Sequence, residues 1–220
     1  MIEIVGVYGT GGCARGLMPL LRMELNLKSI KLIFIDDAAT AGTQVNGHDV
    51  MKWPEFLSTD AIKKSVCLGV ADPTVRLKLA QRCDKEHIPL KNARAENVFE
   101  MDDVIIGEGA CLSPFVTLAS NIKIGRAFHA NIYSYVEHDC RVGDFVTFAP
   151  GAKCNGNVHI HDRAYIGANA VIRQGSPQKP LIIGEGAVIG MGAVVTKDVP
   201  AGTIVMGNPA AEKRKTSLPR

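Results

Sequence analysis

Residues 122–148 read IKIGRAFHANIYSYVEHDCRVGDFVTF, and the spacing of the apolar residues in this stretch decides the fold of the second half of the chain. Every sixth residue is apolar, and the spacing continues on both sides. The twelve consecutive positions are Ile106, Leu112, Leu118, Ile124, Ala130, Val136, Val142, Phe148, Cys154, Ile160, Ile166 and Ile172. A period of six fits neither an α-helix, with about 3.6 residues per turn, nor an alternating strand. The pattern predicts a hexapeptide β-helix.

A second inward position lies four residues after each of the first eleven, and it always holds a small or apolar residue. These residues are Ala110, Val116, Ile122, Phe128, Ser134, Cys140, Val146, Ala152, Val158, Ala164 and Ala170. Two inward positions in six residues predict one short strand and a corner. Three such units close a coil of about 18 residues, and successive coils stack at about 4.8 Å. Residues 18 apart then lie above one another.

The spacing breaks once, at residues 174–182, and resumes at Ile183, Ile189 and Val195. The broken stretch contains Ser-Pro and Lys-Pro pairs, which favour turns, and it is predicted to protrude as a loop. We place the coil domain at residues 100–210 and assign residues 211–220 to a basic tail.

The first half of the chain has a different pattern, which predicts a small Rossmann-like domain at residues 1–90. Residues 2–8 suit a buried strand, followed by a glycine-rich loop and a helical stretch to about residue 27. A second strand over 31–35 ends at Asp36 and Asp37, and a further strand and helix are predicted over 65–70 and 73–86. The predicted fold class is α/β followed by all-β.

The loop at residues 9–14, GTGGCA, has the G-x-G-x-x-A spacing of a phosphate-binding turn. Glycines let a phosphate approach the backbone, and the N-terminus of the next helix favours negative charge. With Asp36 about twenty residues further on, Gly9, Gly11 and Gly12 favour a nucleotide site. A tight turn that binds nothing is the alternative. Because the second half of a dinucleotide fold is absent, we expect a mononucleotide or a nucleotide-linked sugar.

Composition excludes some classes of function. A formal net charge of +3 and an aromatic content of 5% do not suit a nucleic-acid binder, so no such partner is expected. No apolar stretch approaches the roughly 20 residues that span a bilayer, and no leader-like segment opens the chain, so we expect a cytoplasmic protein without membrane insertion. The six cysteines show no C-x-x-C pairing, which predicts reduced structural thiols.

His138 is the strongest candidate for a catalytic residue. It occupies neither inward position of its unit, so it points outward, between Glu137 and Asp139. A carboxylate beside an imidazole can hold one tautomer and stabilise the protonated form, as a general base near neutral pH requires. Gly156, 18 residues further on, leaves room for a ligand and a backbone N–H for a developing oxyanion. A solvated surface cluster is the alternative to a His138–Asp139 dyad.

No zinc site is expected, because a tetrahedral shell of imidazoles would need stacked or neighbouring histidines. The residues 18 after three of the histidines are Thr147 for His129, Gly156 for His138 and Lys179 for His161. His159 and His161 alone would bind a metal only adventitiously.

Five segments resemble the hexapeptide-repeat sugar acetyltransferases of the sialic-acid O-acetyltransferase and bacillosamine N-acetyltransferase type. They are YGTGG at 8–12, FIDD at 34–37, VEHD at 136–139, GAKCNGN at 151–157 and GNPA at 207–210. The resemblance covers nearly the whole chain, and VEHD followed by GAKCNGN is its most specific part. It implies a left-handed parallel β-helix after the Rossmann-like domain, and a homotrimer that binds acetyl-CoA as co-substrate between neighbouring β-helices.

The resemblance also implies roles for individual residues. His138 matches the base that removes the amine proton, and Asp139 matches the carboxylate that orients it. The residues that match contacts to the nucleotide-linked sugar are Gly9, Gly11, Gly12, Asp36, Asp37, Val70, Ala71, Asn131 and Glu137. Those that match contacts to acetyl-CoA are Thr147, Gly156, Ala168, Gly190 and Met191. Cys13 and Thr147 stand where these enzymes often have histidine.

We therefore expect an acetyl-CoA-dependent N-acetyltransferase that acts on a UDP-linked 4-amino-4,6-dideoxy sugar in the synthesis of bacterial surface glycans. Two other functions stay open. One is O-acetylation of a sialic-acid-type sugar by the same dyad. The other is nucleotide-sugar binding by a scaffold whose site is catalytically dead.

Overall fold

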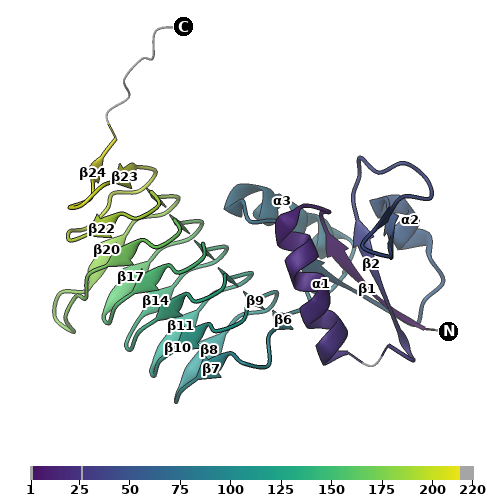
Figure 1. Cartoon of the computed structure of the whole chain (residues 1–220), viewed down its shortest axis with the longest axis horizontal. Helices are drawn as coiled ribbons and strands as arrows, with labels where there is room; N and C mark the ends of the chain where they lie inside the picture. Colours follow the sequence, from purple (N-terminus) through teal and green to yellow (C-terminus); the bar gives the residue numbers. More distant parts are fainter. Residues whose placement is uncertain (1, 26, 214–220) are drawn as a thin grey trace, which may run out of the picture.

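The apolar run at the start of the chain forms the central strand β1 (Glu3–Tyr8) of a sheet in the computed structural model, which describes residues 2–25 and 27–213 (Figure 1). β1 pairs in parallel with β2 (Ile30–Ile35) and β5 (Lys63–Leu68). β4 (His48–Met51) extends the sheet beside β2, and β3 (Gln44–Val45) pairs antiparallel at the edge. The strand order is β3-β4-β2-β1-β5.

Three helices accompany this sheet. α1 (Gly12–Glu24) follows the glycine loop and α3 (Pro73–Lys85) follows β5, close to the predicted bounds. Asp72 caps α3 by accepting a hydrogen bond from the Val75 N–H, and a proline takes the first helical position. α2 (Trp53–Ser58), β3 and β4 were not predicted, because none of them is long enough to show a clear period.

The second half of the chain forms a stack of coils with three faces. The covered face consists of β6 (Ala93–Arg94), β9 (Cys111–Leu112), β12 (His129–Ala130), β15 (Thr147–Phe148), β18 (Tyr165–Ile166), β21 (Val188–Ile189), β23 (Ile204–Met206) and β24 (Ala211–Glu212). The apolar face consists of β7 (Phe99–Glu100), β10 (Thr117–Leu118), β13 (Tyr135–Val136), β16 (Lys153–Cys154), β19 (Val171–Ile172) and β22 (Val194–Val195). The charged face consists of β8 (Val104–Ile106), β11 (Ile122–Ile124), β14 (Arg141–Val142), β17 (Val158–Ile160) and β20 (Leu181–Ile183).

The predicted coil of 18 residues is confirmed by strand pairing. Thr117 pairs in parallel with Tyr135, and Tyr135 pairs with Lys153, each step being 18 residues. Val158 pairs with Leu181, a step of 23, so the predicted loop inserts five residues without disturbing the stack. The left-handed sense of the coil stays a prediction.

The corners of the coil have a backbone signature with the same period of six. From position 103 to position 169 every sixth residue has a positive φ. These residues are Asp103, Gly109, Phe115, Asn121, Ala127, Tyr133, Asp139, Phe145, Gly151, Asn157, Arg163 and Asn169. Asp and Asn tolerate this left-handed conformation better than most residues. The period that predicts the core therefore also fixes the corners.

The first coil begins at Ala93, ahead of the predicted start at residue 100. Arg94 pairs with Leu112 and Glu100 pairs with Leu118, so both occupy the inward phase of the repeat. They form an ion pair at the end of the stack, where no further coil would cover apolar residues. Because both residues are charged, the apolar pattern did not reveal this coil. The division of the chain into separate domains at 1–90 and 100–210 stays a proposal.

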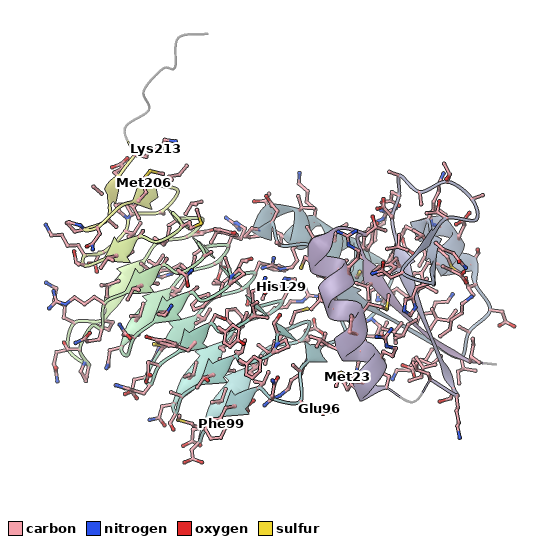
Figure 2. The ribbon with its side chains drawn as sticks, in the orientation of Figure 1. Met23, Glu96, Phe99, His129, Met206 and Lys213 are labelled. Carbon is pink, nitrogen blue, oxygen red and sulfur yellow. The ribbon has the colours of Figure 1, made fainter. Side chains whose placement is uncertain are left out.

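The N-terminal part packs on the covered face. The outward side chains of Cys111, His129 and Thr147 are all buried there, and His129 lies where α1 meets the coil (Figure 2). In the described ranges 2–25 and 27–213, no helix is long and apolar enough to cross a bilayer. All six cysteines are free thiols. Of the predicted basic tail, residues 214–220 lie outside the described residues.

Candidate functional site

The predicted nucleotide cradle forms at the carboxyl ends of three adjacent parallel strands. The glycine loop follows β1, Asp36 and Asp37 follow β2, and residues 70–71 follow β5. Ligands of open parallel sheets bind at such edges. The Thr10 hydroxyl donates to Asp36 Oδ2 at 2.6 Å, which joins the first two of these turns. The structure therefore brings the predicted cradle residues to one edge of the sheet.

The glycines of the loop differ in why the fold needs them. Gly9 has a φ of +100°, so the turn itself favours glycine there. At Gly11 and Gly12 a Cβ would meet no atom within 4 Å, so the fold does not exclude a side chain. α1 begins at this point without a side-chain cap or an acidic residue in its first turn. Bare glycines and uncapped N–H groups together make a site that a phosphate can approach.

Asp37 is not a free acceptor for a ligand, which modifies the predicted role. Its Oδ2 accepts hydrogen bonds from the Tyr8 hydroxyl at 2.7 Å and from Arg82 at 2.5 Å. Desolvation raises the pKa of Asp37, but these two hydrogen bonds, the charge of Arg82 and the Trp53 N–H together hold the pKa below the ordinary aspartate value. Arg82 also lies over the Trp53 ring, at 5.1 Å from its centroid. Asp36, by contrast, accepts from the Thr10 hydroxyl and the Ala38 N–H and has no described cationic partner.

A cavity of about 460 Å³ lies between α1 and the coil. Its walls include Gly12 and Ala71 from the cradle and Asn131 from a corner of the coil. Asn131 Oδ1 accepts the Ile132 N–H at 2.8 Å, which leaves the side-chain amide of Asn131 available as a donor. Three residues predicted to contact a nucleotide-linked sugar thus line one cavity.

Cys13 and His129 face each other in this cavity. Cys13 Sγ lies 3.9 Å from His129 Nδ1. Burial raises the pKa of Cys13 to about 11 and lowers the pKa of His129, so both groups are neutral at pH 7. The described residues hold no group of three or more His, Cys, Asp or Glu side chains that could bind a metal ion. The pair therefore shapes a neutral wall of the cavity.

Thr147 is placed differently from its predicted role beside acetyl-CoA. Its hydroxyl donates to the Ala71 carbonyl at 2.9 Å and accepts from Arg76 at 3.0 Å. Both partners belong to the N-terminal part, and the threonine is buried between them. Because its single O–H is already used, Thr147 joins the two halves of the chain and has no donor left for a thioester.

His138 and Asp139 form the predicted dyad at the corner between the apolar and charged faces. His138 Nδ1 lies 2.7 Å from Asp139 Oδ2, and the imidazole is 55% exposed. The hydrogen bond to Asp139 raises the pKa of His138. Asn121, 18 residues earlier in the stack, donates to Asp139 Oδ1 at 3.2 Å. The carboxylate is held from both sides, and Nε2 of His138 is left as the base.

The imidazole of His138 leaves no room for a side chain at position 156, so glycine is required there. A Cβ at this position would lie 2.6 Å from Cε1 and from Nε2 of His138, so the ring fills the space that the sequence assigned to a ligand. The Gly156 N–H has no acceptor among the described residues, which keeps it available for an oxyanion.

Replacing Gly156 by alanine should displace the His138 ring while leaving the fold intact, because the ring is an exposed side chain that can rotate. We expect kcat to fall by about 10- to 100-fold, a part of what a general base contributes. Steady-state kinetics and thermal unfolding measure the two effects. In a His138→Ala background the same Gly156→Ala change should cost nothing further. A full additional loss there would mean that Gly156 acts independently of His138.

Two residues important to the site were not found from the sequence. Asn121 could have been found, because it lies 18 residues before Asp139 and carries a complementary side chain. Arg76 could not, because it lies on α3 and reaches the coil only through the packing of the two halves.

The predicted acetyl-CoA residues divide between two corners of the coil. Gly156 lies with His138 at the histidine corner, the column of Ser120, His138, Gly156, Gln174 and Lys197. Ala168 and Met191 lie at the methionine corner, between the covered and apolar faces, with Gly190 beside them. Met191 is 80% exposed. Neither Glu137 nor His138 lines the cavity beside α1, so one chain does not bring all the predicted residues together.

Known proteins resemble this chain over nearly its full length. It is 46% identical over 218 residues, 98% of each chain, to GDP-perosamine N-acetyltransferase from Escherichia coli O157:H7. WeeI from Acinetobacter baumannii AYE matches with a TM-score of 0.92 at 52% identity, over 96% of this chain and 100% of that one. PerB from Caulobacter crescentus, solved with CoA and GDP-perosamine, matches with a TM-score of 0.83 at 25% identity, over 96% of this chain and 97% of that one. No family model matches.

Proposed function

Because this chain belongs to the acetyl-CoA-dependent, hexapeptide-repeat sugar N-acetyltransferases, we propose that it acetylates the amino group of a GDP-linked 4-amino-4,6-dideoxy sugar of the perosamine type. The main support for this reaction is the His138–Asp139 pair, in which Nδ1 lies 2.7 Å from Oδ2 and the imidazole lies over Gly156. A product of this kind suits the synthesis of bacterial surface glycans.

In this proposal His138 acts as a general base. As the sugar amine attacks the thioester carbonyl, Nε2 of His138 takes the proton that the amine loses, while Asp139 stabilises the imidazolium. The Gly156 N–H faces the oxygen that becomes negative. The new C–N bond replaces the C–S bond, and the proton held by His138 goes to the departing thiolate. No covalent intermediate with the protein is required.

The nucleotide in this proposal is GDP and not the UDP expected from the sequence alone. The support is the name of a relative that matches 98% of the chain at 46% identity. The glycine loop recognises phosphates, which GDP and UDP share, so it does not distinguish guanine from uracil. Sialic-acid-type O-acetylation has less support. The relative that matches 98% of the chain is named an N-acetyltransferase, whereas one named for O-acetylation of a galactoside is 27% identical over 72% of the chain.

We further propose that the active species is a homotrimer with the site between subunits. In such a trimer, each copy turns its apolar face toward the three-fold axis. The histidine corner of one copy then meets the methionine corner of the next. The outward residues of the apolar face carry one charge and so suit contact between copies: Phe99, Thr117, Tyr135, Lys153, Val171 and Val194. Sedimentation should give a trimer, and an active monomer would contradict this arrangement.

The test of the proposed function is acetyl transfer with acetyl-CoA and three acceptors: GDP-perosamine, a UDP-linked 4-amino-4,6-dideoxy sugar, and a sialic acid. Mass spectrometry of the acceptor detects the gain of one acetyl group. We expect rapid transfer to GDP-perosamine. Preference for the UDP-linked sugar would correct the nucleotide alone, whereas transfer only to the sialic acid would overturn N-acetylation. Nucleotide-sugar binding without transfer to any acceptor would support the scaffold.

The dyad also predicts a pH dependence. His138 is a base only when unprotonated, and its raised pKa means that kcat/KM should rise with pH through a midpoint above the ordinary histidine value of 6.5. Asp139→Asn removes the carboxylate and should move this midpoint to lower pH, with a lower plateau. Asparagine suits the φ of +58° at this position, so the backbone is not strained. An unchanged midpoint would show that Asp139 does not raise the pKa of His138.

A further inference from the structure

Two aromatic side chains at the methionine corner stand in a backbone conformation that such residues seldom adopt. Phe115 and Tyr133 have φ values of +64° and +58°, in the left-handed region that bulky residues avoid. Strand pairing places Gly151, Asn169 and Gly192 above them in the same column. Glycine and asparagine tolerate a positive φ, so the turn itself does not require an aromatic residue at either position.

Both rings lie on the surface and stack on each other. Their centroids are 4.8 Å apart and their planes are parallel within 1°, while Phe115 is 53% exposed and Tyr133 is 60% exposed. Among the described residues, the Tyr133 hydroxyl has no hydrogen-bond partner. Residues that keep an unfavourable backbone conformation cluster at functional sites, and an exposed tyrosine with a free hydroxyl suits contact with a ligand. The packing of the coil does not explain this pair, whereas a contact from outside the chain would.

The rings lie where the sugar cavity reaches the methionine corner. Pro114 and Ile132 line that cavity of about 460 Å³, and each immediately precedes one of the two aromatic residues. Asn131, predicted to contact the sugar, precedes Ile132 and lines the same cavity. A sugar that extends from the cradle through the cavity toward this corner therefore meets Tyr133 next.

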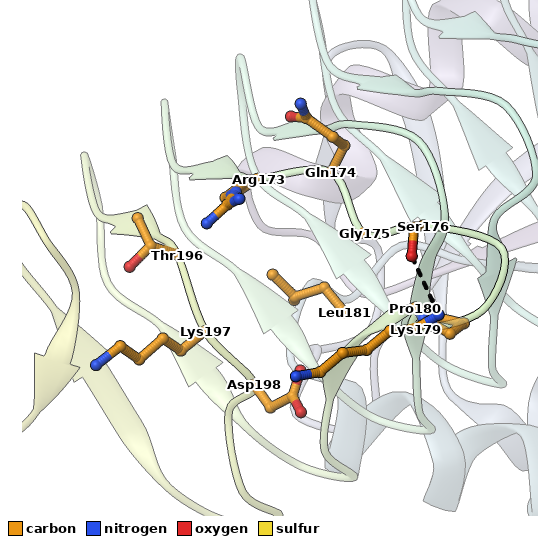
Figure 3. A pocket seen from close by; sticks show the side chains of 10 residues that line it. All are labelled: Arg173, Gln174, Gly175, Ser176, Lys179, Pro180, Leu181, Thr196, Lys197 and Asp198. Atoms are coloured by element: carbon orange, nitrogen blue, oxygen red, sulfur yellow. Dashed lines mark hydrogen bonds between the residues drawn. The ribbon is translucent and has the colours of Figure 1, made fainter.

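Tyr133 lies at the same height in the stack as the dyad. β13 crosses the apolar face between Tyr133 at the methionine corner and His138 at the histidine corner. In the proposed trimer these corners meet, and copies related by an axis along the stack present equal coils at equal height. Tyr133 of one copy then faces His138 of the partner subunit. The recess enclosed by the inserted loop lies further along the stack, where Gln174 and Lys197 follow Gly156, so it is not at this height (Figure 3).

We propose that Tyr133, supported by Phe115, binds the hexose ring of the nucleotide sugar and directs its amino group toward His138 of the partner subunit. This proposal rests on the proposed function and on its trimer. A 4,6-dideoxy hexose has a methyl group and C–H bonds that pack against an aromatic face, and the phenol hydroxyl can bond a sugar hydroxyl. Because Phe115 fixes the ring, little side-chain entropy is lost on binding. Tyr133 thus positions the acceptor and does not contact the nucleotide.

Tyr133→Asn is the main test, because asparagine suits the left-handed backbone and removes the ring. We expect kcat/KM for GDP-perosamine to fall by about tenfold, the equivalent of one lost aromatic contact. The KM for acetyl-CoA and the calorimetric affinity for GDP, which lacks the sugar, should stay at their wild-type values. Thermal unfolding should occur at the wild-type temperature or above it. A merely structural role would instead lower the unfolding temperature and leave the kinetics with the acceptor unchanged.

Three further variants narrow the assignment. Tyr133→Phe keeps the ring and should stay within about threefold of wild type, because it loses one neutral hydrogen bond at most. Phe115→Asn removes only the supporting ring and should give an intermediate loss. Ile105→Thr is the matched control, since Ile105 is 61% exposed on the charged face and its replacement should leave kcat/KM unaltered. A loss in Tyr133→Phe as large as that in Tyr133→Asn would assign the contact to the hydroxyl and overturn the stacking.

Sedimentation and activity separate this proposal from the proposed function. A monomeric Tyr133→Asn protein would mean that the aromatic pair serves assembly, and a loss of GDP affinity would mean that it serves the nucleotide. Either result overturns the proposal. Unchanged kcat/KM for GDP-perosamine in a trimeric Tyr133→Asn protein would overturn it too, while the proposed function stands. Wild-type protein that does not acetylate GDP-perosamine would overturn both.

Discussion

His138→Ala is expected to lower kcat for acetyl transfer by about 10²–10⁴-fold, the usual contribution of a positioned general base. The side chain is 55% exposed, and its described contacts are with Asp139 and the backbone of Gly156. Removing it leaves no buried cavity, so thermal unfolding should change little. CoA affinity should also stay close to the wild-type value, because the imidazole acts on the amine and not on the arm of the donor. Steady-state kinetics and calorimetry measure these quantities.

His161→Ala is the matched control. His161 is also an exposed histidine, but it lies on the charged face. Its loss should leave kcat within about twofold of wild type, as expected for a surface substitution away from any site. If His138→Ala retained normal turnover, the amine would have to lose its proton without this base. The mechanism proposed for the dyad would then be wrong.

The coil could be predicted because its period is dictated by geometry. Each six-residue unit places its first and fifth side chains inward, and the left-handed corner residues recur at the same interval. The 18-residue step then located Gly156 over His138 without any structure. The step did not predict what fills the space over Gly156. The glycine accommodates the imidazole, which follows from where the ring points and not from the spacing.

The packing of the two halves could not be predicted in this way. Cys111, His129 and Thr147 are outward residues of the repeat, and their burial depends on the N-terminal part that covers them. A signal existed, because none of these three positions is permanently charged, whereas Lys123 and Arg141 on the charged face are. The resemblance to known acetyltransferases instead places Thr147 beside acetyl-CoA. Its hydroxyl in fact serves the contact between the halves.

That contact depends most on Arg76, a fully buried cation on α3. Its guanidinium donates to backbone carbonyls on both halves and to one hydroxyl. The acceptors are the carbonyls of Val70, Ala71, Ala127, Phe145 and Val146 and the hydroxyl of Thr147. Burial lowers the pKa of Arg76 to about 10, so it stays charged at neutral pH. Ala127 and Phe145 are left-handed corner residues, and their carbonyls have no other described donor.

Arg76→Met should therefore destabilise the protein by about 3–5 kcal/mol, since the carbonyls of Ala127 and Phe145 would stay buried without a donor and the half-buried Val70 carbonyl would lose its only described donor. At a fixed protomer concentration this corresponds to a fall of about 10 °C or more in the thermal unfolding midpoint. Arg82→Met, on the same helix, removes a partly exposed ion pair with Asp37 and should cost only about 1 kcal/mol or less. Arg76→Lys should recover only part of the loss, because an ammonium cannot reach both halves as the planar guanidinium does. An Arg76→Met protein that unfolds within about 2 °C of wild type would mean that water or relaxation satisfies these carbonyls, and that the apolar contacts alone hold the two halves together.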